Sequence, residues 1–393
     1  MDIRLSRRVN AVRPSPTLAV SARAAELQRQ GKDVVSLGAG EPDFDTPEPI
    51  KNAAKAALDR GFTKYTAVGG TPDLKAAVIA KFARDSNLQY EAKQILVSVG
   101  GKQSFYNLCQ ALLDQGDEVI IPAPYWVSYP DMVLLAGAQP VILSTSAEQQ
   151  FKITPEQLAA AITPATRLLV INSPSNPSGK GYSAAELVAL GEVLRAHPRV
   201  LVASDDMYEK ILFAGARFVN LAMACPDLQD RCIVLNGVSK AYAMTGWRIG
   251  YCAGPAPLIA AMETVQSQST SNPCSIAQAA AQAALESGDT LLGPMLQAFE
   301  HRHNYVYDRL RALPGVQVLP SDGTFYSFPG FQEVMQRKGI SNDLALAERL
   351  LEAGVAVVPG SAFGSPGHLR LSFATSEENL TRALDRISRF VTG

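Results

Sequence analysis

The sequence predicts an α/β protein with a large domain, built on a mostly parallel sheet between helices, and a smaller α+β domain. The first observation is a series of short apolar runs separated mostly by helix-like segments, which is the pattern of parallel strands joined by crossover helices. The second is that the chain from Val316 onward mixes short strands with helices instead of continuing this alternation. The apolar runs are 95–99, 118–121, 140–143, 167–171, 199–203 and 232–235.

At 393 residues the chain is long enough to form two domains. We expect a long amphipathic segment, 291–313, to link them. Residues 1–47 are assigned to an N-terminal arm and part of the small domain, 48–288 to the large domain, and 289–393 to the rest of the small domain. Both ends of the chain would therefore contribute to the small domain.

The composition is that of an ordinary globular enzyme, with 47% hydrophobic and 19% charged residues. The net charge of −1 gives no electrostatic reason to expect a nucleic acid or an anionic membrane as partner. No apolar run approaches the roughly 18 residues of a membrane helix, and the N-terminal segment lacks the apolar core of a signal peptide. The five cysteines are scattered and form no C-x-x-C pair, so we expect reduced thiols in the cytoplasm and no metal site.

The first strand, 34–37, leads into Gly38-Ala39-Gly40-Glu41-Pro42-Asp43-Phe44, which resembles the beginning of a dinucleotide-binding fingerprint. A Rossmann site is rejected because Asp43 stands where the third glycine is required. Glu41 and Asp43 would also repel a pyrophosphate group.

Helices are expected on both sides of the strand series. Thr71 is the expected N-cap of one of them, with Pro72 in its first turn. The last helix begins with Thr375-Ser376-Glu377-Glu378, which we interpret as a capping box. The expected helices outside the strand series are 18–29, 49–60, 71–84, 255–266 and 276–286, and the expected late strands are 316–319, 325–328 and 368–373.

A lysine lies just after the last apolar run, in Asn236-Gly237-Val238-Ser239-Lys240, and Arg248 follows eight positions later. Burial and a nearby cation lower the pKa of a lysine, and its neutral amine can form a Schiff base with an aldehyde. The planar guanidinium of Arg248 is suited to holding an anion. The pair is typical of a site for pyridoxal phosphate, which has an aldehyde and a phosphate. The alternative is a surface loop in which both basic residues are incidental.

Two further motifs follow strands and suit such a cofactor. Gly100-Gly101-Lys102 opens a helix whose free N–H groups would attract a phosphate, although a simple tight turn is the alternative. Trp126 follows the strand 118–121 and is placed to stack on a planar ring, unless it merely fills the core.

Polar residues follow the next two strands. Asn176 lies in a loop fixed by two prolines and offers both a donor and an acceptor. Asp205 is suited to pair with a protonated pyridine nitrogen and Tyr208 to donate to the ring oxygen, whereas Asp206 is readily explained as a helix cap. Because ligands bind at the carboxyl ends of parallel strands, we expect these side chains to lie together.

With these motifs, the chain resembles the fold-type I pyridoxal-phosphate-dependent transferases, in particular the class I aminotransferases. Within that family it is most similar to the bacterial aspartate aminotransferases of subgroup Ib, some of which also use prephenate. The resemblance covers nearly the whole chain and implies transamination between amino acids and 2-oxo acids, a cofactor-binding large domain, and a homodimer with shared active sites. The matching segments are 39–47, 63–65, 100–102, 124–129, 172–179, 236–248 and 374–379.

The resemblance also implies roles for single residues. Lys240, Asp205 and Tyr208 would be the catalytic residues. The implied cofactor contacts are Lys240 as covalent carrier and proton shuttle, Asp205 at the pyridine nitrogen, Asn176 and Tyr208 at the ring oxygen, Trp126 over the ring, and Ser239, Arg248, Gly101 and Lys102 at the phosphate, with Tyr65 from a second subunit.

For the substrate, the resemblance implies that Arg370 binds the α-carboxylate, beside Asn176, Trp126 and the backbone of Gly40. Aspartate or glutamate is the expected amino donor, with oxaloacetate and 2-oxoglutarate as keto partners.

The second carboxylate needs another cation, and Lys102 is the expected one, with hydroxyl donors from Ser15 and Thr17 on the N-terminal arm. Relatives that accept prephenate have a threonine and a lysine matching Thr17 and Lys102, so prephenate is an additional expected acceptor. Arg13 stands where such relatives often have a lysine, which keeps the charge but changes its geometry.

Two positions depart from the better-known family members. Tyr129 occupies the place of a histidine that supports the aspartate, and 266–271 contains no arginine for the distal carboxylate.

Within the family, an aminotransferase specific for aromatic amino acids or alanine is the alternative, and three functions of other classes are also weighed. A lyase, decarboxylase or racemase on the same fold stays open, since a fold does not fix a reaction. A cofactor-sensing regulator would need a DNA-binding module, for which 1–20 is too short. A serine hydrolase is rejected because Gly237-Val238-Ser239-Lys240-Ala241 lacks the final glycine of a nucleophile elbow.

Overall fold

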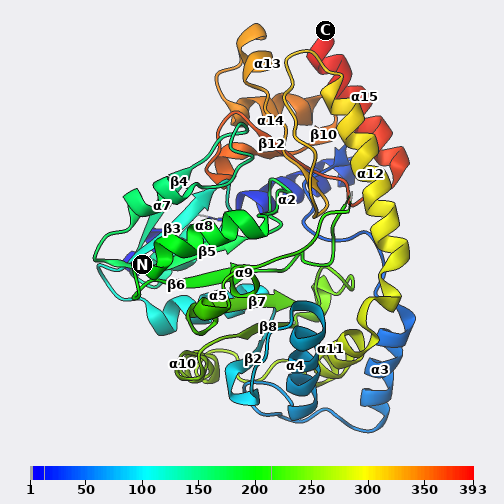
Figure 1. Cartoon of the computed structure of the whole chain (residues 1–393). Helices are drawn as coiled ribbons and strands as arrows, with labels where there is room; N and C mark the ends of the chain where they lie inside the picture. Colours follow the sequence, from blue (N-terminus) through cyan, green and yellow to red (C-terminus); the bar gives the residue numbers. More distant parts are fainter. Residues whose placement is uncertain (1–2, 13, 214) are drawn as a thin grey trace.

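The computed structural model describes residues 3–12, 14–213 and 215–393 of the chain (Figure 1). In this described part the largest sheet has seven strands, in the order β2-β8-β7-β6-β5-β3-β4. Neighbouring strands from β7 to β4 are parallel, whereas β8 runs antiparallel to both β7 and β2. The strands are β2 (Ile95–Ser98), β3 (Glu118–Ala123), β4 (Gln139–Ser144), β5 (Thr166–Asn172), β6 (Leu201–Asp205), β7 (Cys232–Gly237) and β8 (Gly250–Ala253). The prediction of a mostly parallel sheet is confirmed, and each of the six apolar runs forms one of its strands.

Both faces of this sheet are covered by apolar cores. In β7, Val234 belongs to one core, whereas Ile233 and Leu235 belong to the other, as the alternation of side chains along a strand requires. Two-sided burial explains why the strands read as continuous apolar runs. The first core includes residues of α3 (Glu48–Asp59), α4 (Pro72–Ser86), α8 (Ala184–Arg195), α9 (Leu221–Ala224) and α11 (Ser275–Ser287), and the second those of α5 (Gly101–Leu112), α6 (Ser128–Leu135) and α10 (Ala256–Ser267).

A smaller α+β unit lies above the sheet in Figure 1 and has its own core. Strand β1 (Val35–Ser36) pairs in parallel with β10 (Val355–Ala356), so the N-terminal segment joins the C-terminal unit. A second small sheet has the antiparallel order β11-β12-β9. The remaining elements are α1 (Arg7–Asn10), α2 (Pro16–Arg29), α7 (Pro155–Ala161), α12 (Gly293–Arg311), α13 (Gln332–Arg337), α14 (Asp343–Glu352), α15 (Glu377–Thr392), β9 (Tyr326–Ser327), β11 (Val358–Pro359) and β12 (Leu369–Ser372), with short 3₁₀ turns at 92–94, 226–231, 245–247, 288–291 and 360–363.

The structure tests the helix caps and strand limits that the sequence predicts. Thr71 is confirmed as an N-cap, since its side chain accepts from the N–H of Leu74. The capping box at the last helix is wrong, because Ser376 is the cap and accepts from the N–H of Asn379. The expected strand 316–319 is also wrong, because Gln317 forms only an isolated bridge there. Among the described residues, no helix is long and apolar enough to cross a membrane.

Candidate active site

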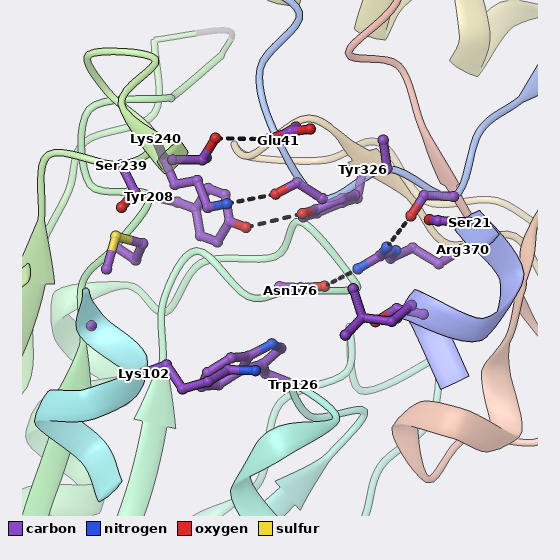
Figure 2. A pocket seen from close by; sticks show the side chains of 18 of the residues that line it. Ser21, Glu41, Lys102, Trp126, Asn176, Tyr208, Ser239, Lys240, Tyr326 and Arg370 are labelled. Atoms are coloured by element: carbon purple, nitrogen blue, oxygen red, sulfur yellow. Dashed lines mark hydrogen bonds between the residues drawn. The ribbon is translucent and has the colours of Figure 1, made fainter. Parts of the chain in front are cut away.

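A cavity of about 580 Å³ lies at the carboxyl ends of the parallel strands, where the small unit meets the sheet. Side chains that follow different strands line it together with residues of the N-terminal segment and the small unit (Figure 2). The sequence-predicted residues that it brings together are Thr17, Gly40, Gly101, Lys102, Trp126, Asn176, Asp205, Tyr208, Ser239, Lys240, Arg248 and Arg370.

Lys240 lies just past β7 and points into the cavity, where its Nζ donates to the carbonyl oxygen of Gly40 at 2.5 Å (Figure 2). Burial lowers the pKa of Lys240 to about 8; the charge of Glu41 opposes this shift, and those of Arg370 and Arg248 add to it. The neutral form of this amine, which attacks an aldehyde, is therefore more populated near neutral pH than in an ordinary lysine.

Asp205 ends β6, and its carboxylate is fixed from two sides. The hydroxyl of Tyr129 donates to Oδ2, and the N–H of Met207 donates to Oδ1 at 3.2 Å. Burial raises the pKa of Asp205, and both hydrogen bonds and the charge of Lys240 oppose that increase. The tyrosine that departs from the better-known family members thus supplies a hydrogen bond to the aspartate.

Arg370 of β12 is a buried cation with an incomplete set of partners. Its Nη1 donates to Oδ1 of Asn176 and its Nη2 to the carbonyl oxygen of Gly38, both at 2.9 Å (Figure 2). Its Nε has no hydrogen-bond partner, and no carboxylate of the described residues forms an ion pair with it. A buried guanidinium in this state fits an anionic ligand, because an unpaired buried charge is costly.

Arg248 and the beginning of α5 form a second cationic corner. Arg248 has a left-handed backbone, with φ 58°, and its guanidinium donates to the carbonyl oxygens of Thr245 and Val99. It lies directly beside Gly100, where a Cβ atom would collide with it. The guanidinium and the free N–H groups of the first turn of α5 together fit a phosphate.

Lys102, in the first turn of α5, places its Nζ 5.2 Å from the centre of the Trp126 ring. Burial, followed by the charge of Arg248, lowers the pKa of Lys102. Trp126 meets Tyr129 edge-on, with ring centres 5.2 Å apart, and lines the cavity beside Lys102 (Figure 2).

Two predicted residues of the described part of the chain, Tyr65 and Ser15, do not line the cavity. Tyr65 is 91% exposed on its loop. The hydroxyls of Ser15 and Thr17 are hydrogen-bonded to each other at 2.9 Å, but only Thr17 lines the cavity. Arg13 lies outside the described residues.

Sequence reasoning missed Tyr326 and gave no role to Glu41. The hydroxyls of Tyr326 and Tyr208 are 3.1 Å apart, and the guanidinium of Arg370 lies 4.3 Å from the centre of the Tyr326 ring (Figure 2). Glu41 accepts from the hydroxyl of Thr245 at 2.7 Å and so connects the N-terminal segment to the Lys240 loop. In the sequence, Tyr326 and Glu41 each lie near a glycine-containing turn, and this proximity does not show which side chains they contact.

The cavity therefore fits pyridoxal phosphate at each of its functional groups. A lysine of lowered pKa suits the aldehyde, the corner at Arg248 suits the phosphate, Asp205 suits the ring nitrogen, and the indole of Trp126 suits the ring face.

The comparisons with known proteins agree with this geometry. The family model "Aminotransferase class I and II" matches residues 32–387. An aspartate/prephenate aminotransferase of Nitrosomonas europaea is 57% identical over 99% of this chain and 100% of its own length. An aspartate aminotransferase of Geobacillus stearothermophilus is 51% identical over 99% of each chain.

Solved structures give the same result. The aspartate aminotransferase of Rhizobium meliloti superimposes with a TM-score of 0.96 at 49% identity, over 99% of each chain. The Thermus thermophilus enzyme with maleate has a TM-score of 0.94 at 45% identity, over 99% of this chain and 100% of that one. Fold and site thus define a pyridoxal-phosphate-dependent transaminase. The chain belongs to the class I and II aminotransferase family.

Proposed function

We propose that this enzyme transfers the amino group of L-aspartate to 2-oxoglutarate, giving oxaloacetate and L-glutamate. The observation that carries the proposal is the presence of two cationic side chains, Arg370 and Lys102, in one cavity without ion-pair partners among the described residues. A dicarboxylic substrate would satisfy both. The relatives named aspartate aminotransferase support this choice.

The cofactor in this proposal is pyridoxal 5'-phosphate. When bound, it withdraws electrons from the substrate α-carbon and carries the amino group between the two half-reactions. The residues that would hold it are Lys240 at the aldehyde, Arg248, Ser239 and Gly101 at the phosphate, Asp205 at the ring nitrogen, Asn176 and Tyr208 at the ring oxygen, and Trp126 over the ring.

Two side chains of this chain would act on the substrate, and a third would act on the cofactor. Lys240, as the general base, moves a proton to and from the α-carbon, for which a pKa of about 8 is well matched. Arg370 holds the α-carboxylate in place, which disfavours its loss as carbon dioxide. Asp205, fixed by Tyr129, would pair with the cofactor ring nitrogen.

Prephenate is proposed as an additional acceptor, since it is a keto acid with a second carboxylate. Thr17 and Lys102 line the cavity as this role requires, and the relative of Nitrosomonas europaea is named for both substrates. A lyase on the same fold would differ in its products, so assaying both the keto acid and the new amino acid separates the two reactions.

Replacing Lys102 tests the substrate assignment. Lys102→Ala should lower kcat/KM for aspartate by about 2–4 kcal/mol, roughly 30- to 700-fold, because a charge-assisted contact is lost. The loss for alanine or phenylalanine should be much smaller, and Lys102→Arg should retain part of the preference for aspartate. An equal loss for all donors would show that Lys102 serves the cofactor phosphate instead of the substrate.

We also propose a homodimer with shared active sites, in which Tyr65 reaches the phosphate of the partner subunit. The 91% exposure of Tyr65 and the open apolar hollow beside Arg248, lined by Trp247 and Ile276, support this arrangement.

The pairing of β1 with β10 supports the proposed division of the chain into domains 1–47, 48–288 and 289–393. All five cysteines are free thiols, which supports a reducing, cytoplasmic compartment.

Subunit mixing tests the shared site. Tyr65→Ala and Lys240→Ala should each be impaired alone, whereas exchange between them should restore about a quarter of wild-type activity, because half of the dimers are mixed and each has one intact site. Each variant mixed with itself is the control. Proven exchange without recovery would argue against Tyr65 acting across an interface.

A further inference from the structure

A second buried acid, Asp206, follows Asp205 directly and has no part in the mechanism above. Side chains of β6 alternate between the two faces of the sheet, so that Val202 belongs to one core and Ala203 to the other. Asp205 lies on the face of Ala203, where Tyr129 bonds to it and the cavity opens. Asp206 therefore points to the opposite face, away from the cavity, and is 1% exposed.

The carboxyl group of Asp206 is held by two neutral donors. The hydroxyl of Ser204 donates to Oδ1 at 2.7 Å, and the amide of Asn220, which caps α9, donates to Oδ2 at 2.6 Å. No lysine or arginine of the described residues forms an ion pair with it. Burial raises the pKa of Asp206 well above its usual range. Both carboxyl oxygens therefore receive a hydrogen bond from a side chain, as buried polar atoms require.

The backbone at Asp206 is also held in a turn behind the sheet. The N–H of Asp206 donates to the carbonyl oxygen of Leu235 in β7, and the N–H of Glu209 donates to the carbonyl oxygen of Asp206, both at 2.9 Å. Glu209 in turn forms an ion pair with Lys81 of α4. Residues 206 and 209 are thus anchored behind the sheet, while Asp205, Met207 and Tyr208 line the cavity.

We propose that Asp206 is a positioning residue, whose hydrogen bonds to Ser204 and Asn220 hold the 205–208 turn so that Asp205 and Tyr208 meet the cofactor ring in the correct geometry. This inference rests on the proposed function, since it assigns the ring to Asp205 and Tyr208. Active-site groups must be held within fractions of an ångström, and a displacement of 1 Å caused by a distant change can cost on the order of 100-fold in rate.

Two variants of Asp206 test the proposal in the cofactor-loaded, full-length enzyme. Asp206→Ala removes both accepted hydrogen bonds and should lower kcat roughly 30-fold or more, with KM changed less than about threefold. It should also shift the pH midpoint of the visible absorbance of the loaded protein, because Asp205 moves relative to the ring. Asp206→Asn should restore most of kcat and the midpoint, since its amide can accept from Asn220 and donate to Ser204.

Asp343→Ala is the matched control, because Asp343 is 2% exposed in the small unit, where it accepts from the N–H of Ser361. It should lower thermal stability without moving kcat or the absorbance midpoint. If Asp206→Ala lowers stability alone, like this control, the positioning role is refuted. Should Asp206→Ala fail to fold, Ser204→Ala removes one of the two donors, and an unchanged kcat and midpoint in that variant would overturn the proposal.

Measurements on the wild-type protein distinguish failure of the proposed function from failure of the positioning role. If it forms no visible absorbance with pyridoxal phosphate, the proposed function fails irrespective of Asp206. If the wild type is loaded and active but the Asp206 variants match it, only the positioning role fails.

Discussion

Lys240→Ala is expected to lower the rate of transamination on the order of 10⁵-fold, since we propose this side chain as both the attachment point of the cofactor and the base that moves the substrate proton. The protein should still take up the cofactor, because Arg248, Trp126 and Asp205 line the cavity and would hold the cofactor without the lysine. Steady-state assays at saturating cofactor, with absorbance spectra of the same samples, measure both effects. Lys152→Ala, which removes a lysine paired with Glu186 outside the cavity, should change neither.

The lowered pKa of Lys240 predicts how the rate of cofactor uptake changes with pH. Because burial lowers this pKa to about 8, the rate of cofactor uptake by unloaded protein should rise as the pH increases through that value. A rate that is independent of pH between about 6 and 9 would contradict the assignment of Lys240 as the reacting amine, and so would a Lys240→Ala variant with more than about one percent of wild-type turnover.

Arg370→Leu is expected to lower kcat/KM by about 4 kcal/mol, on the order of 10³-fold, for every amino donor. The physical reason is that the α-carboxylate is common to all donors, and that the buried guanidinium has an unpartnered Nε and two fixed Nη groups ready to receive it. Arg370→Lys keeps the charge but loses the planar fork, so a smaller loss is expected.

Kinetics with aspartate, glutamate and alanine distinguish this role from that of Lys102. Arg370→Leu should affect all three donors alike, with the absorbance of the bound cofactor retained. An effect confined to the two dicarboxylic donors would place the distal carboxylate, and not the α-carboxylate, at Arg370.

The sequence was informative wherever the geometry of parallel strands decides the outcome. Asn176, Asp205 and Lys240 follow three parallel strands, and strands that run in one direction end at the same edge of the sheet. Their meeting in one cavity was therefore predictable from the strand pattern. The antiparallel direction of β8 was not, because an apolar run reads the same in either direction.

The resemblance placed Tyr129 at the position of a residue that supports the aspartate, but the contacts themselves depend on tertiary packing, which the sequence does not specify. The hydroxyl of Tyr129 reaches Asp205 from a helix on another part of the sheet, and Tyr326 reaches Tyr208 from the small unit. Neither distance follows from spacing along the chain. The position of Tyr65, exposed in one chain, likewise has meaning only if a second chain is present.

Gln266 shows why a missing motif residue is hard to interpret from sequence. The segment 266–271 lacks the arginine that would bind a distal carboxylate. In the structure Gln266 is fully buried and donates to the carbonyl oxygens of Val68 and Val97, both at 2.8 Å. Its side chain therefore anchors the loop that carries Tyr65, and does not face the substrate.

The most direct test of the central claim is reduction of the cofactor-loaded protein with borohydride, followed by peptide mass spectrometry. If Lys240 carries the cofactor, reduction should abolish the visible absorbance and leave a pyridoxyl-phosphate group on the peptide that contains Lys240. A full-strength adduct on another lysine, or a fully active protein that yields no adduct on the Lys240 peptide, would contradict the account.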